Sequence, residues 1–291
     1  MKPTVFIQAN ARQHLGAKIS AHSYKRNSRN PESFDVRILD TRDFPRLMDP
    51  DQSILRGREV RQWDPDDLQS FTPLRFYPPQ AMGFEGVAVV TDPDVFALGD
   101  VGELIGRDLQ GKAVWAVARH GHNRRRNYIA TSVMLLDCSK LKHWRFDDEL
   151  DALFAHKFDY LDWIDLKRED QSTIGLLEPE WNDFDRLTRR TKLLHTTKRR
   201  TQPWKTGLPV DFTLRRAWPV DLFNKLFLRY SPHPDPNQEA FVYSLLAEMY
   251  DAGEVTEKEL RQEMAANHVR HDSLALIDRY RGWDPHMALA A

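Results

Sequence analysis

Two carboxylates separated by one residue, Asp92 and Asp94, closely follow the apolar run 86–90. In α/β folds, ligands bind at the carboxyl ends of buried strands. Carboxylate oxygens at this spacing are suitable ligands for Mg²⁺ or Mn²⁺, with Pro93 between them to hold the turn. Asp-Pro-Asp is also ordinary turn chemistry, so a metal site and a plain turn both fit this tripeptide.

A basic segment from Arg119 to Asn127 lies between two expected strands and contains His120 and His122. A His-x-His pair can bind a metal ion, but no third ligand is near it in the sequence, so we do not expect a metal here. Contact with an anionic acceptor, such as an acidic or phosphorylated glycan, is one interpretation. A solvated surface loop is the other.

Strand-like and helix-like segments alternate through the first two thirds of the chain. Segments of strand length are 5–7, 34–39, 86–90, 113–117 and 132–136, and the segment 14–28 has helical spacing. The last three strand segments are continuously apolar, which is typical of strands covered on both faces of an α/β sheet. We therefore predict an α/β fold with a central, mostly parallel sheet flanked by helices.

The last third of the chain is expected to be helical. Apolar residues between Phe241 and Met249 fall on one face of a helix, and Thr256 with Glu259 forms a capping-box pattern that opens another. We predict an α/β catalytic body over residues 1–205 and a helical appendage over residues 206–291.

The overall composition excludes several classes of protein. The 291 residues include 42 Lys and Arg against 43 Asp and Glu, and this balance argues against bulk nucleic-acid binding. No apolar run has the ~18–20 residues that a membrane span requires, and the N-terminal residues do not form a secretory signal. Cys138 is the only cysteine, so no intrachain disulfide can form. We expect a cytoplasmic protein without a transmembrane segment or a nucleic-acid partner.

Several of these segments, taken together, resemble nucleotide-sugar glycosyltransferases. The likeness is to the retaining type that includes glycogenin and the bacterial lipopolysaccharide galactosyltransferases, a family-8-like group. The matching segments are 71–76, 83–94 with the Asp-x-Asp at its end, 132–137, 178–182, 192–196 and 202–204, together with the N-terminal strand, loop and helix. The resemblance covers roughly residues 3 to 205 and implies a GT-A fold, which is a Rossmann-like mixed sheet between helices.

The resemblance also implies roles for residues at matching positions. The expected ligands of Mn²⁺, or of Mg²⁺, are Asp92, Asp94 and His195. The expected nucleotide-binding residues are Ala9, Asn10, Ala11, Lys18, Arg75, Thr91, Asp92 and Pro93. The expected diphosphate-binding residues are Lys198, Arg200 and Trp204. Taken alone, His195 at the end of an apolar pair fits a core residue as well as a ligand.

The acceptor side is less well defined. Asp162 best matches the catalytic Asp of the family, and Trp163 replaces the Gln that normally follows it. A plain helix with three exposed acids, Asp159, Asp162 and Asp165, fits the same segment.

Other positions depart from the family pattern. Gln202 stands where the family usually has a Lys that reaches the donor's diphosphate, and the glycine expected between His195 and Pro203 is missing. The Asn before and the Gly after the 132–136 strand are also absent. Any one of Lys198, Arg199 and Arg200 could supply the missing charge.

The expected function is metal-dependent transfer of a sugar, with retention, from a nucleotide diphosphate donor to an acceptor. A UDP-hexose is the expected donor, a glycan or another hydroxyl compound is the expected acceptor, and a homo-oligomer is possible. Two alternatives are a scaffold that binds nucleotide sugars without catalysis and a nucleotide-sugar hydrolase.

Overall fold

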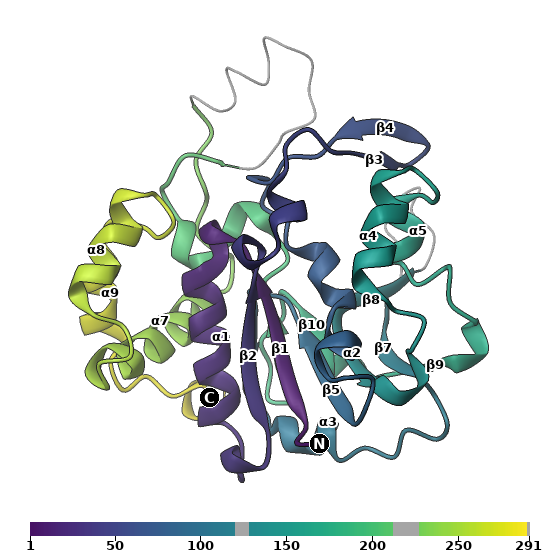
Figure 1. The fold of residues 1–291 in the computed structure, drawn as a ribbon. Coiled ribbons are helices and arrows are strands. Elements are labelled where there is room, and N and C mark those ends of the chain that lie inside the picture. Colours follow the sequence, from purple (N-terminus) through teal and green to yellow (C-terminus); the bar gives the residue numbers. More distant parts are fainter. Residues whose placement is uncertain (120–127, 212–226, 290–291) are drawn as a thin grey trace.

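A six-stranded sheet forms the centre of the computed structural model, which describes residues 1–119, 128–211 and 227–289 (Figure 1). Its strand order is β2-β1-β5-β8-β7-β9. The strands are β1 (Thr4–Ala9), β2 (Asp35–Asp40), β5 (Val87–Thr91), β7 (Val114–Arg119), β8 (Tyr128–Asp137) and β9 (Ile174–Leu176). Only β8 runs antiparallel to its neighbours, β5 and β7. The predicted mixed, mostly parallel sheet is confirmed.

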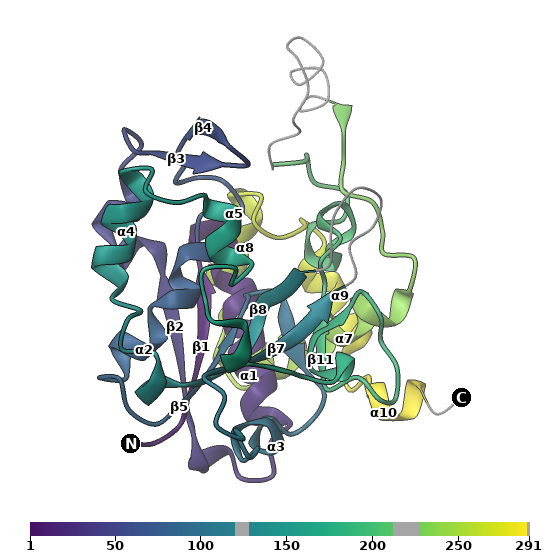
Figure 2. The same ribbon diagram turned by 90° about the vertical axis from the view of Figure 1, so that its right-hand side faces the viewer.

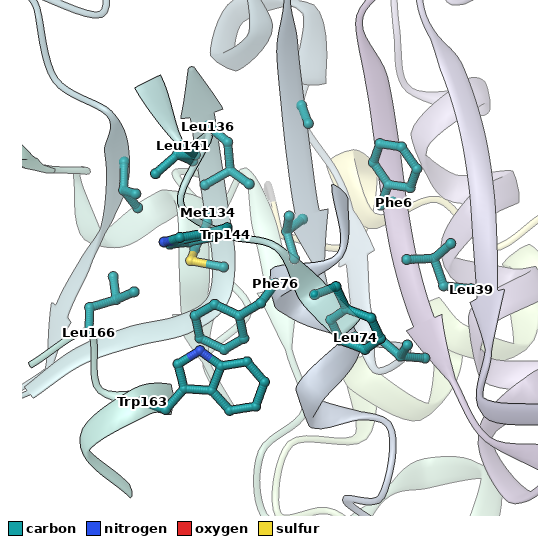
Figure 3. Packing of buried hydrophobic residues seen from close by; sticks show 14 of the residues in the cluster. Phe6, Leu39, Leu74, Phe76, Met134, Leu136, Leu141, Trp144, Trp163 and Leu166 are labelled. Carbon is teal, nitrogen blue, oxygen red and sulfur yellow. The ribbon is translucent and has the colours of Figure 1, made fainter. Parts of the chain in front are cut away.

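The three continuous apolar runs of the sequence form the middle of this sheet as β5, β8 and β7. Their side chains are almost all buried, because helices and loops cover both faces. On one face, Phe6, Met134 and Leu136 pack with the aromatic rings of connecting segments (Figure 3). The rings of Phe76 and Trp163 stack there at a centroid distance of 4.4 Å.

A smaller sheet of three strands lies beside the main one and has the order β10-β11-β6. Its strands are β6 (Val95–Ala97), β10 (Asp183–Phe184) and β11 (Leu193–His195). The middle strand, β11, pairs parallel with β10 and antiparallel with β6. Because β6 begins directly after Asp94, this pairing brings two distant parts of the sequence to one place.

Helices and a hairpin surround the sheets (Figures 1 and 2). The elements of the body are α1 (His14–Arg26), the β3–β4 hairpin (Ser53–Arg56 and Glu59–Gln62), α2 (Pro78–Ala81), α3 (Val101–Ile105), α4 (Phe146–Phe154) and α5 (Tyr160–Ile164). Helix α1 lies between the sheet and the C-terminal helices, and α2, α4 and α5 lie on the opposite side (Figure 1). Gly16 lets α1 approach the site, because an added Cβ there would lie 3.0 Å from the carbonyl oxygen of Pro93.

The C-terminal region is helical, as predicted, and packs on α1 (Figure 1). Its helices are α7 (Pro236–Asp251), α8 (Glu257–Ala265), α9 (Ser273–Tyr280) and α10 (Pro285–Ala288). The capping box of Thr256 and Glu259 is present at the start of α8. Phe241 and Leu245 of α7 share one apolar cluster with Ile19 of α1, so the two predicted parts are in close contact. A domain boundary after residue 205 stays a prediction.

Within the three described ranges, every helix is too short or too polar to cross a lipid bilayer.

Candidate active site

The carboxylates and the imidazole of the predicted metal site lie together at the carboxyl end of β5. Asp92 follows β5, Asp94 precedes β6, and His195 ends β11. Because His195 is paired with Val95 across the small sheet, its Nε2 lies 3.3 Å from Oδ1 of Asp94. One ligand atom from each of Asp92, Asp94 and His195 lies within 4.8 Å of the other two. Two carboxylates and one imidazole are a donor set that fits Mn²⁺ and related divalent cations.

Arg75, in the 3₁₀ turn Thr72–Phe76, is buried against Asp92. Its Nε donates to Oδ1 of Asp92 at 2.9 Å, and its Nη2 donates to Oδ2, so the ion pair has two points of contact. Its Nη1 donates to the hydroxyl of Thr131 at 2.9 Å. Burial raises the pKa of the Asp92 carboxyl, and the positive charge of Arg75 acts against this. Arg75 therefore orients Asp92 and favours its charged form.

His195 is supported from the side opposite to Asp94. Its Nδ1 lies 2.8 Å from Oδ1 of Asn182, and Nδ2 of Asn182 donates to Oγ of Ser132 at 3.0 Å. The carbonyl oxygen of Ser132 in turn accepts from the backbone N–H of Asp92 at 3.0 Å. His195, Asn182, Ser132 and Asp92 are all buried. Asn182 and Ser132 lie in two of the segments that resemble the glycosyltransferase family, 178–182 and 132–137, but the sequence predicted no role for either residue.

A cavity of about 270 Å³ lies beside this cluster. Asp92, Asp94 and His195 line it together with apolar residues such as Leu68 and Phe71. The cavity therefore offers cation ligands and apolar contacts in one place, the combination found in sites for polar small molecules.

Gln13 and Gln202 line the cavity, and the side-chain oxygen of each has no hydrogen-bond partner in the described part of the chain. Both oxygens, Oε1 of Gln13 and Oε1 of Gln202, are buried. Nε2 of Gln202 donates to Oδ2 of Asp94 at 3.3 Å, which leaves the oxygen as the unpaired end. A buried acceptor without a partner costs about 1–3 kcal/mol, so these oxygens fit a ligand that donates hydrogen bonds, such as a hydroxyl compound or water.

Asp165, rather than Asp162, lines the cavity. Asp162 lies on α5 with an exposed side chain, and its Oδ1 accepts from Nζ of Lys167 at 2.8 Å. Asp165 is the residue just after α5, where the helix ends, and its side chain is mostly covered. The position of Asp162 does not fit the catalytic role expected from the sequence. Trp163, between them, is buried in the core.

Arg199 is the one residue of the basic segment 198–200 that lines the cavity. Lys198 and Arg200 are exposed, and the backbone N–H of Lys198 donates to Oδ1 of Asp185 at 2.9 Å. The placement therefore argues against the diphosphate-binding roles expected for Lys198 and Arg200 and selects Arg199.

Arg119 is a second cationic residue of the cavity wall. Its guanidinium lies over the ring of Phe184 at 4.0 Å, and this ring in turn lies 5.4 Å from the imidazole of His195. The remainder of the basic loop, residues 120–127, lies outside the described residues.

The loop after β1 contacts the segment 67–70, part of which lines the cavity. Nδ2 of Asn10 donates to the carbonyl oxygen of Asp67 and to Oγ of Ser70, both at 3.0 Å. Ala9 is buried at the end of β1, and Ala11 is exposed. None of these three predicted nucleotide-binding residues lines the cavity; Gln13, two residues further on, does.

Two other expected nucleotide-binding residues, Thr91 and Pro93, flank Asp92 without lining the cavity. Thr91 is buried within β5, where it pairs with Val133 of β8. Their placement suits support of the Asp-x-Asp turn rather than ligand contact.

Lys18 and Trp204 lie away from the cavity. Nζ of Lys18 donates to the carbonyl oxygen of Glu254 at 3.2 Å and pairs with Glu259 at 3.5 Å, so its charge is directed to the C-terminal region. Trp204 is buried in the apolar cluster shared with α7, with its ring 5.7 Å from that of Phe96. Neither residue lines the cavity, and the roles expected for Lys18 and Trp204 stay predictions.

The chain was compared with known proteins. No protein-family model and no curated protein sequence matches it. Among solved structures, the apo form of the glycosyltransferase GlyE from Streptococcus pneumoniae TIGR4 is similar, with a TM-score of 0.50 and 16% identity over 78% of this chain and 61% of GlyE. The bifunctional glycosyltransferase WbbM has a TM-score of 0.50 and 15% identity over 82% of this chain and 51% of WbbM.

The chain has the GT-A fold of glycosyltransferases. The fold implied by the Asp-x-Asp turn and its neighbouring segments is thereby confirmed. The chain spans only 51% to 64% of the length of the first solved structures it resembles. What this GT-A chain does is therefore argued from its own site.

Proposed function

We propose that this protein is a divalent-metal-dependent glycosyltransferase that moves a sugar from a nucleotide diphosphate donor to a hydroxyl acceptor. The observation that carries the proposal is the convergence of Asp92, Asp94 and His195 at the edge of a GT-A sheet. They lie beside a cavity that is also lined by arginine and apolar side chains. A UDP-hexose donor and retention of configuration are the specific form of the proposal, and they rest on the sequence resemblance.

The cation would be held by Asp92, Asp94 and His195. When bound, a divalent cation neutralises charge on the diphosphate that leaves with the nucleotide. Mn²⁺ suits a set that includes imidazole better than Mg²⁺ does.

Other residues of the chain would bind the diphosphate, orient Asp92 and contact the acceptor. Arg199 is placed to stabilise negative charge on the departing diphosphate, an electrostatic contribution that grows where water is excluded. Arg75 keeps Asp92 oriented through its two-point ion pair. Asp165 also lines the cavity, and it is the carboxylate we assign to the acceptor side. The amide oxygens of Gln13 and Gln202 are available to accept hydrogen bonds from ligand hydroxyl groups.

The proposal is tested by incubating the full chain with a panel of nucleotide sugars and Mn²⁺, with and without candidate glycan acceptors. Nucleotide release that requires an acceptor supports transfer. Release without an acceptor indicates the hydrolase, and donor binding without release indicates the scaffold. Asp94→Asn serves as the inactive control, and a thermal-shift screen of UDP, GDP and ADP with Mn²⁺ identifies the base, because a ligand that binds the native state raises its melting temperature.

A further inference from the structure

The imidazole of His195 lies between two different kinds of partner. On one side, its Nε2 faces the carboxylates of the cluster, at 3.3 Å from Oδ1 of Asp94. On the other side, its Nδ1 lies 2.8 Å from the amide oxygen of Asn182. Asn182 is 1% exposed, so water does not compete for this contact.

The partner of Nδ1 decides which ring nitrogen is a ligand. A neutral imidazole has one N–H and one lone pair, and an amide oxygen can only accept a hydrogen bond. With the oxygen of Asn182 facing it, Nδ1 of His195 carries the proton. In the neutral ring the lone pair is then on Nε2, where it can bind a cation that lies between the ring and the carboxylate of Asp94. Without a cation, this carboxylate can only accept a hydrogen bond from Nε2.

A second contact anchors the other end of the Asn182 amide. Its Nδ2 donates to Oγ of Ser132 at 3.0 Å, so the amide nitrogen is directed to β8 and the amide oxygen to the ring. The backbone carbonyl of the same Ser132 accepts from the N–H of Asp92. Ser132 thus contacts both arms of the cluster, Asp92 directly and His195 through Asn182.

We propose that Asn182 is a positioning residue that holds His195 in the Nδ1–H form, with Nε2 free to bind a divalent cation, and that Ser132 anchors the far end of the Asn182 amide. The inference rests on the metal site of the proposed function, and it adds a residue, Asn182, that does not line the cavity. Supporting contacts of this kind typically change metal affinity by about 10- to 100-fold.

The test measures Mn²⁺ affinity by calorimetry in the full chain without nucleotide. Asn182→Leu removes the acceptor with little change of volume and should weaken Mn²⁺ binding by about 10- to 100-fold. Asn182→Asp keeps an oxygen that accepts from Nδ1, and the Ser132 hydroxyl can donate to it, so affinity should return to within about threefold of the wild type. A merely structural role would leave the Mn²⁺ affinity of folded Asn182→Leu unchanged.

Two controls separate the inference from the proposed function. Asn27→Leu removes another partly buried amide, which donates to the carbonyl oxygens of Ser23 and Ala97, and should leave Mn²⁺ affinity unchanged. His195→Ala should weaken binding at least as much as Asn182→Leu. If His195→Ala binds Mn²⁺ like the wild type, the metal site itself is wrong. If His195→Ala is impaired but folded Asn182→Leu is not, only the positioning role is wrong.

A spectroscopic measurement reports the tautomer directly. Nitrogen-15 NMR of the histidine side chains, with Zn²⁺ as a diamagnetic cation that binds imidazole, should show the proton of His195 on Nδ1. A proton on Nε2 in the metal-loaded wild type would overturn the inference.

Discussion

The guanidinium of Arg75 holds both carboxylate oxygens of Asp92, and the two side chains are buried together at the edge of the cation cluster. Such a pair loses the solvation of two charges, and removing one member leaves the other charge buried without a partner. The pair thereby couples the stability of the fold to the geometry of the site.

Arg75→Met should therefore lower the free energy of unfolding by about 3–5 kcal/mol, as measured by urea denaturation. Arg75→Lys should lose less, because it keeps the charge while giving up the two-point contact. Arg145→Met is the matched control: Arg145 pairs with Asp148 with both side chains exposed, and its loss should cost about 0–1 kcal/mol. A loss of under 1 kcal/mol for Arg75→Met would contradict the prediction.

Asp165 and Asp162 give a direct comparison of two carboxylates on one segment. Asp165→Asn should lower kcat for sugar transfer by at least about tenfold, because its side chain lines the cavity. Asp162→Asn should keep kcat within about twofold, because this exposed residue pairs with Lys167 at the surface. The measurement is the initial rate at saturating donor and Mn²⁺. The reverse order of the two effects would restore Asp162 as the acceptor-side residue.

Arg199 should distinguish diphosphate from monophosphate ligands. Arg199→Met should weaken UDP binding by about tenfold, the loss of one charge-assisted hydrogen bond, and should affect UMP less, since UMP lacks the second phosphate. Calorimetric titrations in the presence of Mn²⁺ measure both. The exposed neighbours provide controls, because Lys198→Met and Arg200→Met should each change UDP affinity by under about twofold. Equal losses of UDP and UMP affinity in Arg199→Met would argue against contact with the diphosphate.

Gln202 should contribute to ligand binding at the expense of stability. Gln202→Met removes a buried oxygen that lacks a partner, so the ligand-free protein should be as stable as the wild type or more stable. Affinity for the nucleotide sugar should fall nevertheless. Gln238→Met, in α7, is the matched control, since the Gln238 amide is also buried and unpaired but does not line the cavity. It should leave affinity unchanged, and equal affinities for all three proteins would remove Gln202 from the binding site.

The carboxylate of Asp40, at the end of β2, should make a pH-dependent contribution to the free energy of unfolding. Burial acts to raise the pKa of its carboxyl, but hydrogen bonds from His14 and Arg42 outweigh burial and hold the pKa well below its ordinary value. The stabilisation is therefore fully present above about pH 4, the pKa of Asp in an unfolded chain, and is lost as the pH falls towards the lower pKa of the folded state.

Asp40→Asn can keep the oxygen that accepts from the backbone N–H of Arg42. It removes the charge and replaces the oxygen that faces His14 and Nη2 of Arg42 with an amide nitrogen. It should cost about 1–2 kcal/mol at pH 7, and the difference from the wild type should shrink between pH 4 and pH 2 in urea denaturation. The exposed neighbour Asp43→Asn should be nearly neutral throughout. A difference that is constant down to pH 2 would show that the charge of Asp40 is not what stabilises the fold.

The sequence by itself determined the sheet and the place of the cluster. A strand formed by a continuous apolar run such as 86–90 is stable only when both of its faces are buried. This requirement depends on the run itself and not on its position in the chain. An Asp-x-Asp after such a run must lie at the carboxyl edge of the sheet, where ligands bind. The capping box of Thr256 and Glu259 was predictable for a similar reason, since its hydrogen bonds are local.

Only the tertiary structure decided which side chain of each short segment faces the cavity. In the segment 198–200, neighbouring side chains point in different directions, and packing against the cavity wall selects Arg199. At the end of α5, the same kind of selection exposes Asp162 and turns Asp165 inward.

Contacts between residues that are far apart in the sequence could likewise not be predicted from periodicity and local motifs. The β6–β11 register brings His195 to Asp94, and Arg75 meets Asp92 because the 3₁₀ turn Thr72–Phe76 packs under β5. Trp204, which sequence alone assigned to the diphosphate, is drawn into the core because the C-terminal helices offer an apolar surface for its ring. Periodicity and local motifs report burial and turns, whereas these contacts depend on how separate elements pack in three dimensions.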